Sequence, residues 1–92
     1  MRKIKNKISQ HAEEKRQNRG ISKWAIDFVI VQYDKCQKRY NKRTAISISK
    51  KKLKEFRKYG EITAQQLEKL LGLTIIQSLD NHIVTVYYQS KN

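Results

Sequence analysis

The sequence predicts a small α+β domain, in which N-terminal helices pack on an antiparallel sheet of three to four strands that ends in a C-terminal hairpin. Two observations predict this class. Apolar residues cluster with helical periodicity in the first third of the chain, and residues 73–79 and 82–89 form two runs rich in β-branched side chains. The 92 residues make one domain, and an apolar content of 38% suffices for one modest core.

Two helices are expected at the start of the chain. A mostly polar helix over residues 8–18 would end near Gly20, because glycine readily adopts the left-handed conformation that follows many helices. Ser22 is the expected N-cap of a second helix. This helix is apolar on nearly all sides between residues 24 and 33, which predicts that it is the buried centre of the domain.

The middle of the chain alternates between basic and apolar segments. Residues 34–43 lack a periodic pattern, and we expect a basic loop or a frayed helix end there. The short run 44–48 alternates between polar and apolar residues like a strand. Ser49 is then the expected N-cap of a helix over residues 50–58.

A last helix and a hairpin complete the predicted fold. Thr63 and Gln66 have the spacing of a capping box at the start of a helix over residues 64–71. Asp80–Asn81 would form the two-residue loop of the hairpin, because Asp and Asn both tolerate positive φ angles.

The strongest compositional signal is a net charge of +13. Residues 1–19 carry seven Lys or Arg and two Glu, and residues 35–58 carry eleven and one, so these two segments hold the whole excess. Such a charge favours a nucleic acid, an anionic membrane or an acidic protein as partner. No membrane is expected, because the N-terminal segment has a thin apolar face and the chain has no transmembrane run. A basic surface that only aids solubility is the alternative.

The single cysteine and the two histidines limit the chemistry. Cys36 alone cannot form an internal disulfide, which favours a cytoplasmic location, and it is expected to be a small buried hydrophobe. No set of residues has the spacing of metal ligands, and no cofactor is expected. Residues 1–7 are expected to be disordered, and the single domain would span residues 8–90.

A ridge of cations follows the short middle strand. On the helix over residues 50–58 the charged side chains lie opposite Leu53 and Phe56, where they can straddle the phosphates of a nucleic acid. Lysine reads bases poorly, so a weak sequence preference is expected. A merely solvated helix face is the alternative. The residues predicted to bind nucleic acid are Arg43, Lys50, Lys51, Lys52, Lys54, Arg57 and Lys58.

Three functional side chains stand four residues apart near the N-terminus. His11, Lys15 and Arg19 would stack on one face of the first helix. RNA cleavage without a metal requires proton transfer from a 2′-OH, cations around the phosphorus and stabilisation of the 5′-oxygen. A histidine, a lysine and an arginine can supply these functions. The alternative is an exposed histidine beside ordinary surface charges.

The last strand would present two more candidates. Val84 and Val86 are expected to face the core, so that Thr85 and Tyr87 point outward. There a hydroxyl can bind phosphate and a ring can stack on a base. The alternative, which the sequence alone favours, is that Tyr87 is an ordinary amphipathic strand residue.

Two motifs resemble a known family. The run from His11 to Ser22, with the pattern His-Ala-x-x-Lys-x-x-x-Arg-Gly-Ile-Ser, resembles the opening motif of the domain of unknown function 4258 family. The run 80–87, Asp-Asn-His-Ile-Val-Thr-Val-Tyr, resembles its closing hairpin. The resemblance implies the small ribonuclease superfold of barnase, colicin nucleases and RelE-like toxins, whose active site lies on an antiparallel sheet. Members often have Arg where this chain has Lys15. The resemblance implicates His11, Arg19 and Thr85, with Tyr87 as a neighbour on the same strand face.

The leading hypothesis is therefore a metal-independent ribonuclease of toxin type that cleaves single-stranded or ribosome-associated RNA. Charge and resemblance together also predict an acidic protein partner that holds the enzyme inactive. One alternative is a non-catalytic nucleic-acid-binding accessory protein with the same charge. Another is an interaction domain whose basic face meets only an acidic protein. The candidate catalytic residues are His11, Lys15, Arg19, Thr85 and Tyr87.

Overall fold

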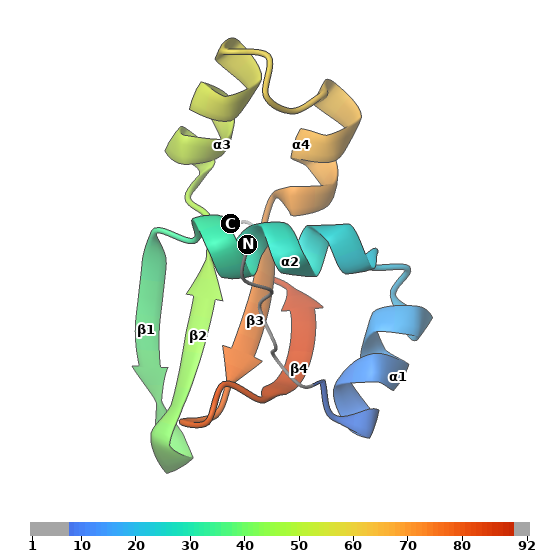
Figure 1. Ribbon diagram of the computed structural model, residues 1–92, viewed down its shortest axis with the longest axis vertical. Coiled ribbons are helices and arrows are strands. Elements are labelled where there is room, and N and C mark those ends of the chain that lie inside the picture. The colour runs from blue at the N-terminus through green and yellow to red at the C-terminus, as the bar shows by residue number, and fades with distance from the viewer. Residues whose placement is uncertain (1–7, 90–92) are drawn as a thin grey trace, which may run out of the picture.

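A computed structural model of the chain describes residues 8–89. It confirms the predicted α+β class, with four α-helices and a four-stranded antiparallel sheet that ends in a hairpin (Figure 1). The expected disorder of residues 1–7 lies outside the described residues, as does residue 90 of the expected domain. Along the chain the elements are α1 (Gln10–Asn18), α2 (Lys23–Gln32), β1 (Lys35–Arg39), the short 3₁₀ helix η1 (Tyr40–Lys42), β2 (Arg43–Ser47), α3 (Lys50–Lys58), α4 (Ala64–Leu70), β3 (Leu73–Gln77) and β4 (Ile83–Tyr88).

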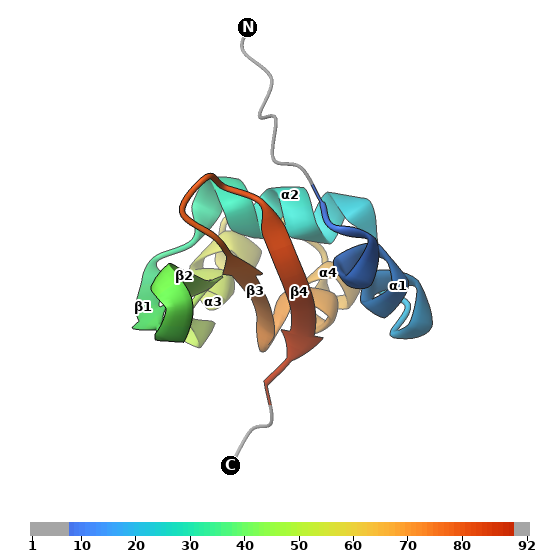
Figure 2. The same cartoon turned by 90° about the horizontal axis from the view of Figure 1, so that it is seen from below.

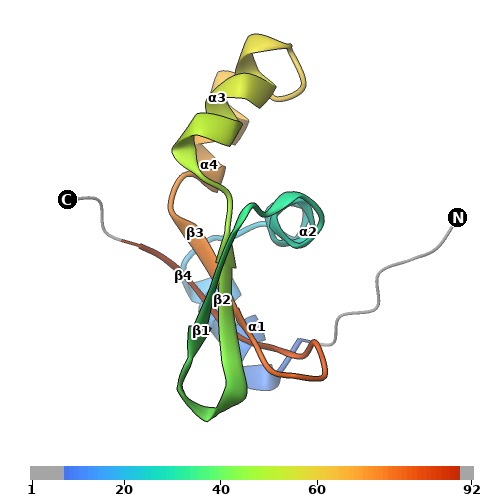
Figure 3. The ribbon, with the colours of Figure 1, turned by 90° about the vertical axis from the view of Figure 1, so that its left-hand side faces the viewer.

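The helices cover one face, one end and one edge of the sheet. The strand order is β1-β2-β3-β4. α2 lies across one face, and α3 and α4 pack together beyond the end of β2 and β3 (Figure 3). α1 runs beside β4 (Figure 2). No helix of residues 8–89 covers the opposite face of the sheet. The largest fully buried side chains are Ile21, Val29, Ile46, Leu53, Leu70, Leu73, Ile75 and Val86.

The first strand is the main departure from the sequence prediction. Residues 35–39, which were expected in a basic loop, form the edge strand β1, and all five are exposed. The prediction was wrong because a fully exposed strand needs no apolar alternation, and β1 is held by its pairing with β2. Cys36, opposite Ile46 in this pairing, is exposed and not buried as expected, because it lies at the uncovered edge of the sheet. The predicted strand 44–48 is confirmed as β2, one residue earlier.

The helix α2 is less buried than its apolar sequence predicts. Ala25, Ile26 and Val29 are buried in the core, whereas Trp24 and Val31 are 37% and 57% exposed. The prediction of a helix buried on all sides was wrong. A helix on one face of a single sheet has an outer side that only a further layer could cover, and the described chain has no such layer.

Side-chain capping bonds form at two of the three predicted N-caps, whereas Ser22 occupies the N-cap position of α2 without a side-chain capping bond. The Ser49 hydroxyl accepts a hydrogen bond from the Lys52 amide at 3.1 Å at the start of α3. Thr63 and Gln66 form the reciprocal capping box of α4. Gly20, just after α1, has a φ of 65°. These interactions join residues a few positions apart, which is why the sequence alone predicts them.

The hairpin of β3 and β4 contains a bulge that changes which residues face the core. Residues 76 and 77 of β3 pair with Thr85 and Ile83, so Val84 has no partner on β3. Ile83 and Val86 are buried, and Val84 is only half-buried. The prediction that Val84 faces the core was wrong, because one extra residue inverts the alternation along a strand. Beyond the bulge, Val86 faces the core as predicted and Thr85 faces the other side.

Candidate nucleic-acid interface

The uncovered side of the sheet, here called the open face, is polar and basic. The register places alternate residues of each strand on it, so that Gln37 lies opposite Ala45, Ala45 opposite Ile76, and Ile76 opposite Thr85. Its described part carries three cations and no acidic side chain. The residues of the open face are Lys35, Gln37, Arg39, Arg43, Ala45, Ser47, Thr74, Ile76, Thr85 and Tyr87.

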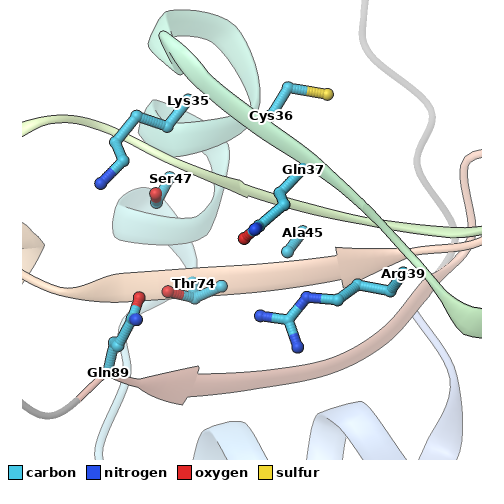
Figure 4. A pocket seen from close by; sticks show the side chains of 8 residues that line it. All are labelled: Lys35, Cys36, Gln37, Arg39, Ala45, Ser47, Thr74 and Gln89. Atoms are coloured by element: carbon cyan, nitrogen blue, oxygen red, sulfur yellow. The ribbon is translucent and has the colours of Figure 1, made fainter.

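A pocket of about 440 Å³ lies on the open face beside β1. Figure 4 shows side chains of β1, β2 and β3 gathered above the strands, with Gln89 reaching in from beyond β4. The Cys36 side chain points away from this group (Figure 4). Polar and charged groups dominate, which suits a charged ligand better than an apolar one. The lining residues are Lys35, Cys36, Gln37, Arg39, Ala45, Ser47, Thr74 and Gln89.

One hydrogen bond crosses the whole open face. Arg39 on β1 donates from Nη2 to the Tyr87 hydroxyl on β4 at 3.3 Å, over the two strands between them. Four strands about 4.8 Å apart would separate β1 from β4 by roughly 14 Å, so the two side chains meet above the middle of the sheet. The small side chain of Ala45 on β2 leaves room for them. A guanidinium in this position offers a planar fork of donors to a phosphate.

The helix α1 seals the outer edge of β4. Ser9, the N-cap of α1, donates from its amide to the Ile83 carbonyl at 3.0 Å and from its hydroxyl to the Val84 carbonyl at 3.2 Å. At the other end of α1, Arg19 Nη1 donates to the Val86 carbonyl at 2.8 Å. These bonds satisfy carbonyl groups that a fifth strand would otherwise pair with. Arg19 therefore holds α1 on the sheet edge and does not line the pocket of Figure 4.

His11 and Lys15 lie on the flank of α1 that borders the open face. On the opposite flank Glu13 pairs with Arg16, whose Nη1 donates to the Ile21 carbonyl in the turn that leads to α2. Since α2 covers the other face of the sheet, helical geometry directs the remaining flank to the open side. His11 is exposed and Lys15 is half-buried. Neither lines the pocket, and helical geometry places both on the side of α1 opposite to Glu13.

The five candidate catalytic residues thus occupy three places. Thr85 and Tyr87 share the open face with Arg39. His11 and Lys15 border this face from α1, and Arg19 is engaged at the edge of β4. The first helix and the last strand are neighbours, but Arg39, which reaches across the sheet to Tyr87, was not among the residues predicted from the sequence.

Of the cations predicted to bind nucleic acid, Arg43 begins β2 and the others lie on α3, which follows the other end of β2 (Figure 1). Lys52 differs from the others, because it is half-buried and its ammonium donates to the Gln32 carbonyl at 2.8 Å. The same ammonium lies 5.8 Å from the centre of the Phe56 ring, so it stabilises the packing of α3 on α2. The remaining predicted residues, Arg43, Lys50, Lys51, Lys54, Arg57 and Lys58, are all exposed.

None of the cations predicted to bind nucleic acid forms an ion pair with an acidic side chain of residues 8–89. Within residues 8–89 the ion pairs are Glu13 with Arg16 at 2.6 Å and Asp80 with His82 at 2.8 Å. Hydrogen bonds from Arg16 lower the pKa of Glu13, and hydrogen bonds with Ser78 and His82 lower the pKa of Asp80 to about 2. Asp80 lies in the loop between β3 and β4, which is longer than the predicted two residues. Both pairs are away from the open face, which keeps its positive charge.

The comparisons with known proteins add no relative. No model of a known family matches the chain, and no curated protein or solved structure is similar to it. Among the described residues, no group of three or more His, Cys, Asp or Glu side chains could hold a metal ion. No helix between residues 8 and 89 has the length and apolar character needed to cross a membrane. The geometry of the open face therefore carries the functional interpretation.

Arg39 was not among the site residues predicted from the sequence, because β1 was expected to be a loop. A signal for this strand is present in the sequence. Long polar side chains stand at every second position, at Lys35, Gln37 and Arg39. Asn41, which tolerates positive φ, follows them, and the alternating run 44–48 comes next, as in a hairpin. A polar hairpin of this kind has no buried side, so hydrophobic periodicity does not reveal it.

Proposed function

We propose that this protein is a metal-independent ribonuclease that binds single-stranded RNA across the open face of its sheet. The observation that carries the proposal is the hydrogen bond between Arg39 and Tyr87 over a basic face without acidic side chains. Phosphodiester groups suit guanidinium and ammonium donors that no carboxylate neutralises. A tyrosine ring on the same face can stack on a base. The resemblance of the two sequence motifs to a family with a ribonuclease-like fold supports the same conclusion.

The proposed reaction is a transesterification within the RNA chain. The 2′-oxygen of a ribose attacks the adjacent phosphorus, and the bond from phosphorus to the 5′-oxygen breaks. The products are a 2′,3′-cyclic phosphate and a 5′-hydroxyl. His11 accepts the proton of the 2′-OH, and solvent protonates the departing 5′-oxygen. Arg39 and Lys15 stabilise the charge on the non-bridging phosphate oxygens.

The other candidate residues have supporting roles in this proposal. Arg19 is a positioning residue, because its bond to the Val86 carbonyl holds α1, and with it His11, against β4. Thr85 and Tyr87 stand between α1 and Arg39, where they would contact the RNA backbone and a base. The exposed cations of α3 would hold the RNA beyond the site and make its binding depend on salt.

Cleavage is tested with labelled single-stranded RNA in the presence of EDTA. The wild-type protein should produce 2′,3′-cyclic phosphate ends, and His11→Ala should lower the rate at least about 100-fold, the range expected for a general acid or base. His82→Ala is the matched control, because His82 lies in the β3–β4 loop and pairs with Asp80. It should cleave at the wild-type rate. RNA that stays intact with the wild type, whether free or bound to ribosomes, refutes the enzymatic proposal.

A non-catalytic nucleic-acid-binding protein is the second candidate. One observation favours it: within residues 8–89 the open face has no histidine or carboxylate, so proton transfer depends on His11 at its border. This candidate predicts binding that weakens steeply with salt and leaves RNA intact. An acidic protein partner, proposed from the charge, would compete for the same cations, and displacement of bound RNA would reveal it.

A further inference from the structure

The tip of the β1–β2 hairpin, residues 38–43, carries four cations within six residues, and the pairing of the two strands does not require them. Arg39 and Arg43 lie directly opposite each other in the register. Like charges in opposed positions destabilise a pair of strands. Lys38 and Lys42 add two further cations, and no acidic side chain between residues 8 and 89 forms an ion pair with any of the four. An anion bound at the hairpin tip would relieve this repulsion.

Lys42 has a backbone conformation that disfavours lysine. Asn41 and Lys42 have φ angles of 60° and 58°, the left-handed values of the two central residues of a tight β-turn, in which the Arg43 amide donates to the Tyr40 carbonyl. Asparagine tolerates this region, but the second position of such a turn is usually glycine. A lysine there costs about 1 kcal/mol relative to glycine, so the turn keeps a charge where glycine would be more stable.

An exposed aromatic ring completes the hairpin tip. Tyr40 is 92% exposed, so both faces of its ring are open to solvent. A pocket of about 290 Å³ lies at the hairpin tip. Tyr40 does not line it but adjoins Arg39 in the chain, which does, and the lining draws on both sides of the sheet, since Lys38 and Thr44 face away from the open face. A ring for stacking next to a cationic pocket supplies the two parts of a nucleotide site. The pocket is lined by Lys38, Arg39, Lys42, Arg43, Thr44 and Leu79.

We propose that the hairpin tip binds one unpaired nucleotide, with its phosphate held by Lys42 and Arg43 and its base stacked on Tyr40. This inference rests on the proposed function for the identity of the ligand as RNA, but it concerns a site that adjoins the open face at the hairpin tip. Bases inside a duplex are already stacked and paired, so the hairpin tip would select single strands. Arg39 lines both pockets, so a strand held at the tip continues onto the open face.

The binding test uses a 2′-O-methyl oligonucleotide of about 12 nucleotides, which has no 2′-OH to attack its phosphates, and the same sequence as a duplex. Tyr40→Leu removes the ring but keeps an apolar side chain. It should weaken single-strand binding about 5- to 10-fold and leave duplex binding unchanged. Lys42→Gly should weaken single-strand binding and reduce its salt slope by about 0.7. The matched controls Tyr33→Leu, just after α2, and Lys69→Gln, on α4, should bind like the wild type.

A nuclear magnetic resonance titration with adenosine 5′-monophosphate separates the two proposals. Amide shifts at residues 38–43 that are lost in Tyr40→Leu support the nucleotide site, even if the oligonucleotide does not bind and the proposed function fails. Oligonucleotide binding that is equal in Tyr40→Leu and the wild type, with no shifts at residues 38–43, overturns the nucleotide site and leaves the proposed function standing. A protein that binds neither probe refutes both.

Discussion

Replacing Arg19 tests whether α1 is held on the sheet by the hydrogen bond to the Val86 carbonyl. This bond is 2.8 Å long and joins residues 67 positions apart. Val86 is fully buried, so Arg19→Met, which keeps much of the aliphatic stem, leaves a carbonyl at the sheet edge without its donor. Hydrogen bonds to charged groups contribute about 1.5–3 kcal/mol. Because Arg19 itself is exposed, competition with water reduces the expected loss to about 1–2 kcal/mol.

Urea unfolding followed by circular dichroism measures this loss. We expect Arg19→Met to lower the free energy of unfolding by about 1–2 kcal/mol, and a domain of this size loses about 4–8 °C in Tm for each kcal/mol. Arg57→Met is the matched control, because Arg57 is an exposed arginine of α3. It should stay within about 0.5 kcal/mol of the wild type.

Two results would refute the reasoning about Arg19. An Arg19→Met protein as stable as the wild type would show that the bond to Val86 does not hold α1. If that stable variant had also lost RNA cleavage, Arg19 would act on the substrate, as the motif resemblance implies. Ser9→Ala is an independent check at the other end of α1. It removes the cap of the Ala12 amide and the bond to the Val84 carbonyl, and should cost about 1–2 kcal/mol.

The remaining predictions concern the turns. Gly72→Ala should cost about 1–3 kcal/mol and more than Gly60→Ala, since both have positive φ angles but an added Cβ at Gly72 lies 3.0 Å from the Gln89 carbonyl oxygen and at Gly60 meets nothing within 4 Å. Equal losses of Tm in the two variants would contradict this. Hydrogen bonds within its loop lower the pKa of Asp80 from 3.8 to about 2, so this carboxylate stabilises the folded state above pH 3.8 and loses that effect as the pH falls through 2. Asp80→Asn should therefore flatten the pH dependence of the free energy of unfolding in this window, and an unchanged profile would show that the carboxylate contributes nothing. Lys42→Gly should raise the free energy of unfolding by about 0.5–1 kcal/mol, whereas a less stable variant would reveal a structural role for the lysine side chain.

Local signals in the sequence determined the helices and the last hairpin. Ser49 and Thr63 cap helices that begin where the sequence predicts, because a cap joins groups within the first turn. The β-rich runs of residues 73–79 and 82–89 pair with each other, since adjacent strands need only a short loop to meet. The cationic side of the molecule was equally predictable, because exposed charge depends on composition and not on packing.

Only the tertiary structure decided where the polar strand, the bulge and the central contact of the site lie. β1 exists because β2 offers it hydrogen bonds, and its exposed side chains leave no apolar pattern to detect. The bulge at Val84 lies in a strand that packs between β3 and α1, and the alternation of residues along one strand does not reveal it. Arg39 and Tyr87 are 48 positions apart and meet because of the order of four strands. No sequence period brings such residues together, since their contact depends on how the whole sheet is assembled.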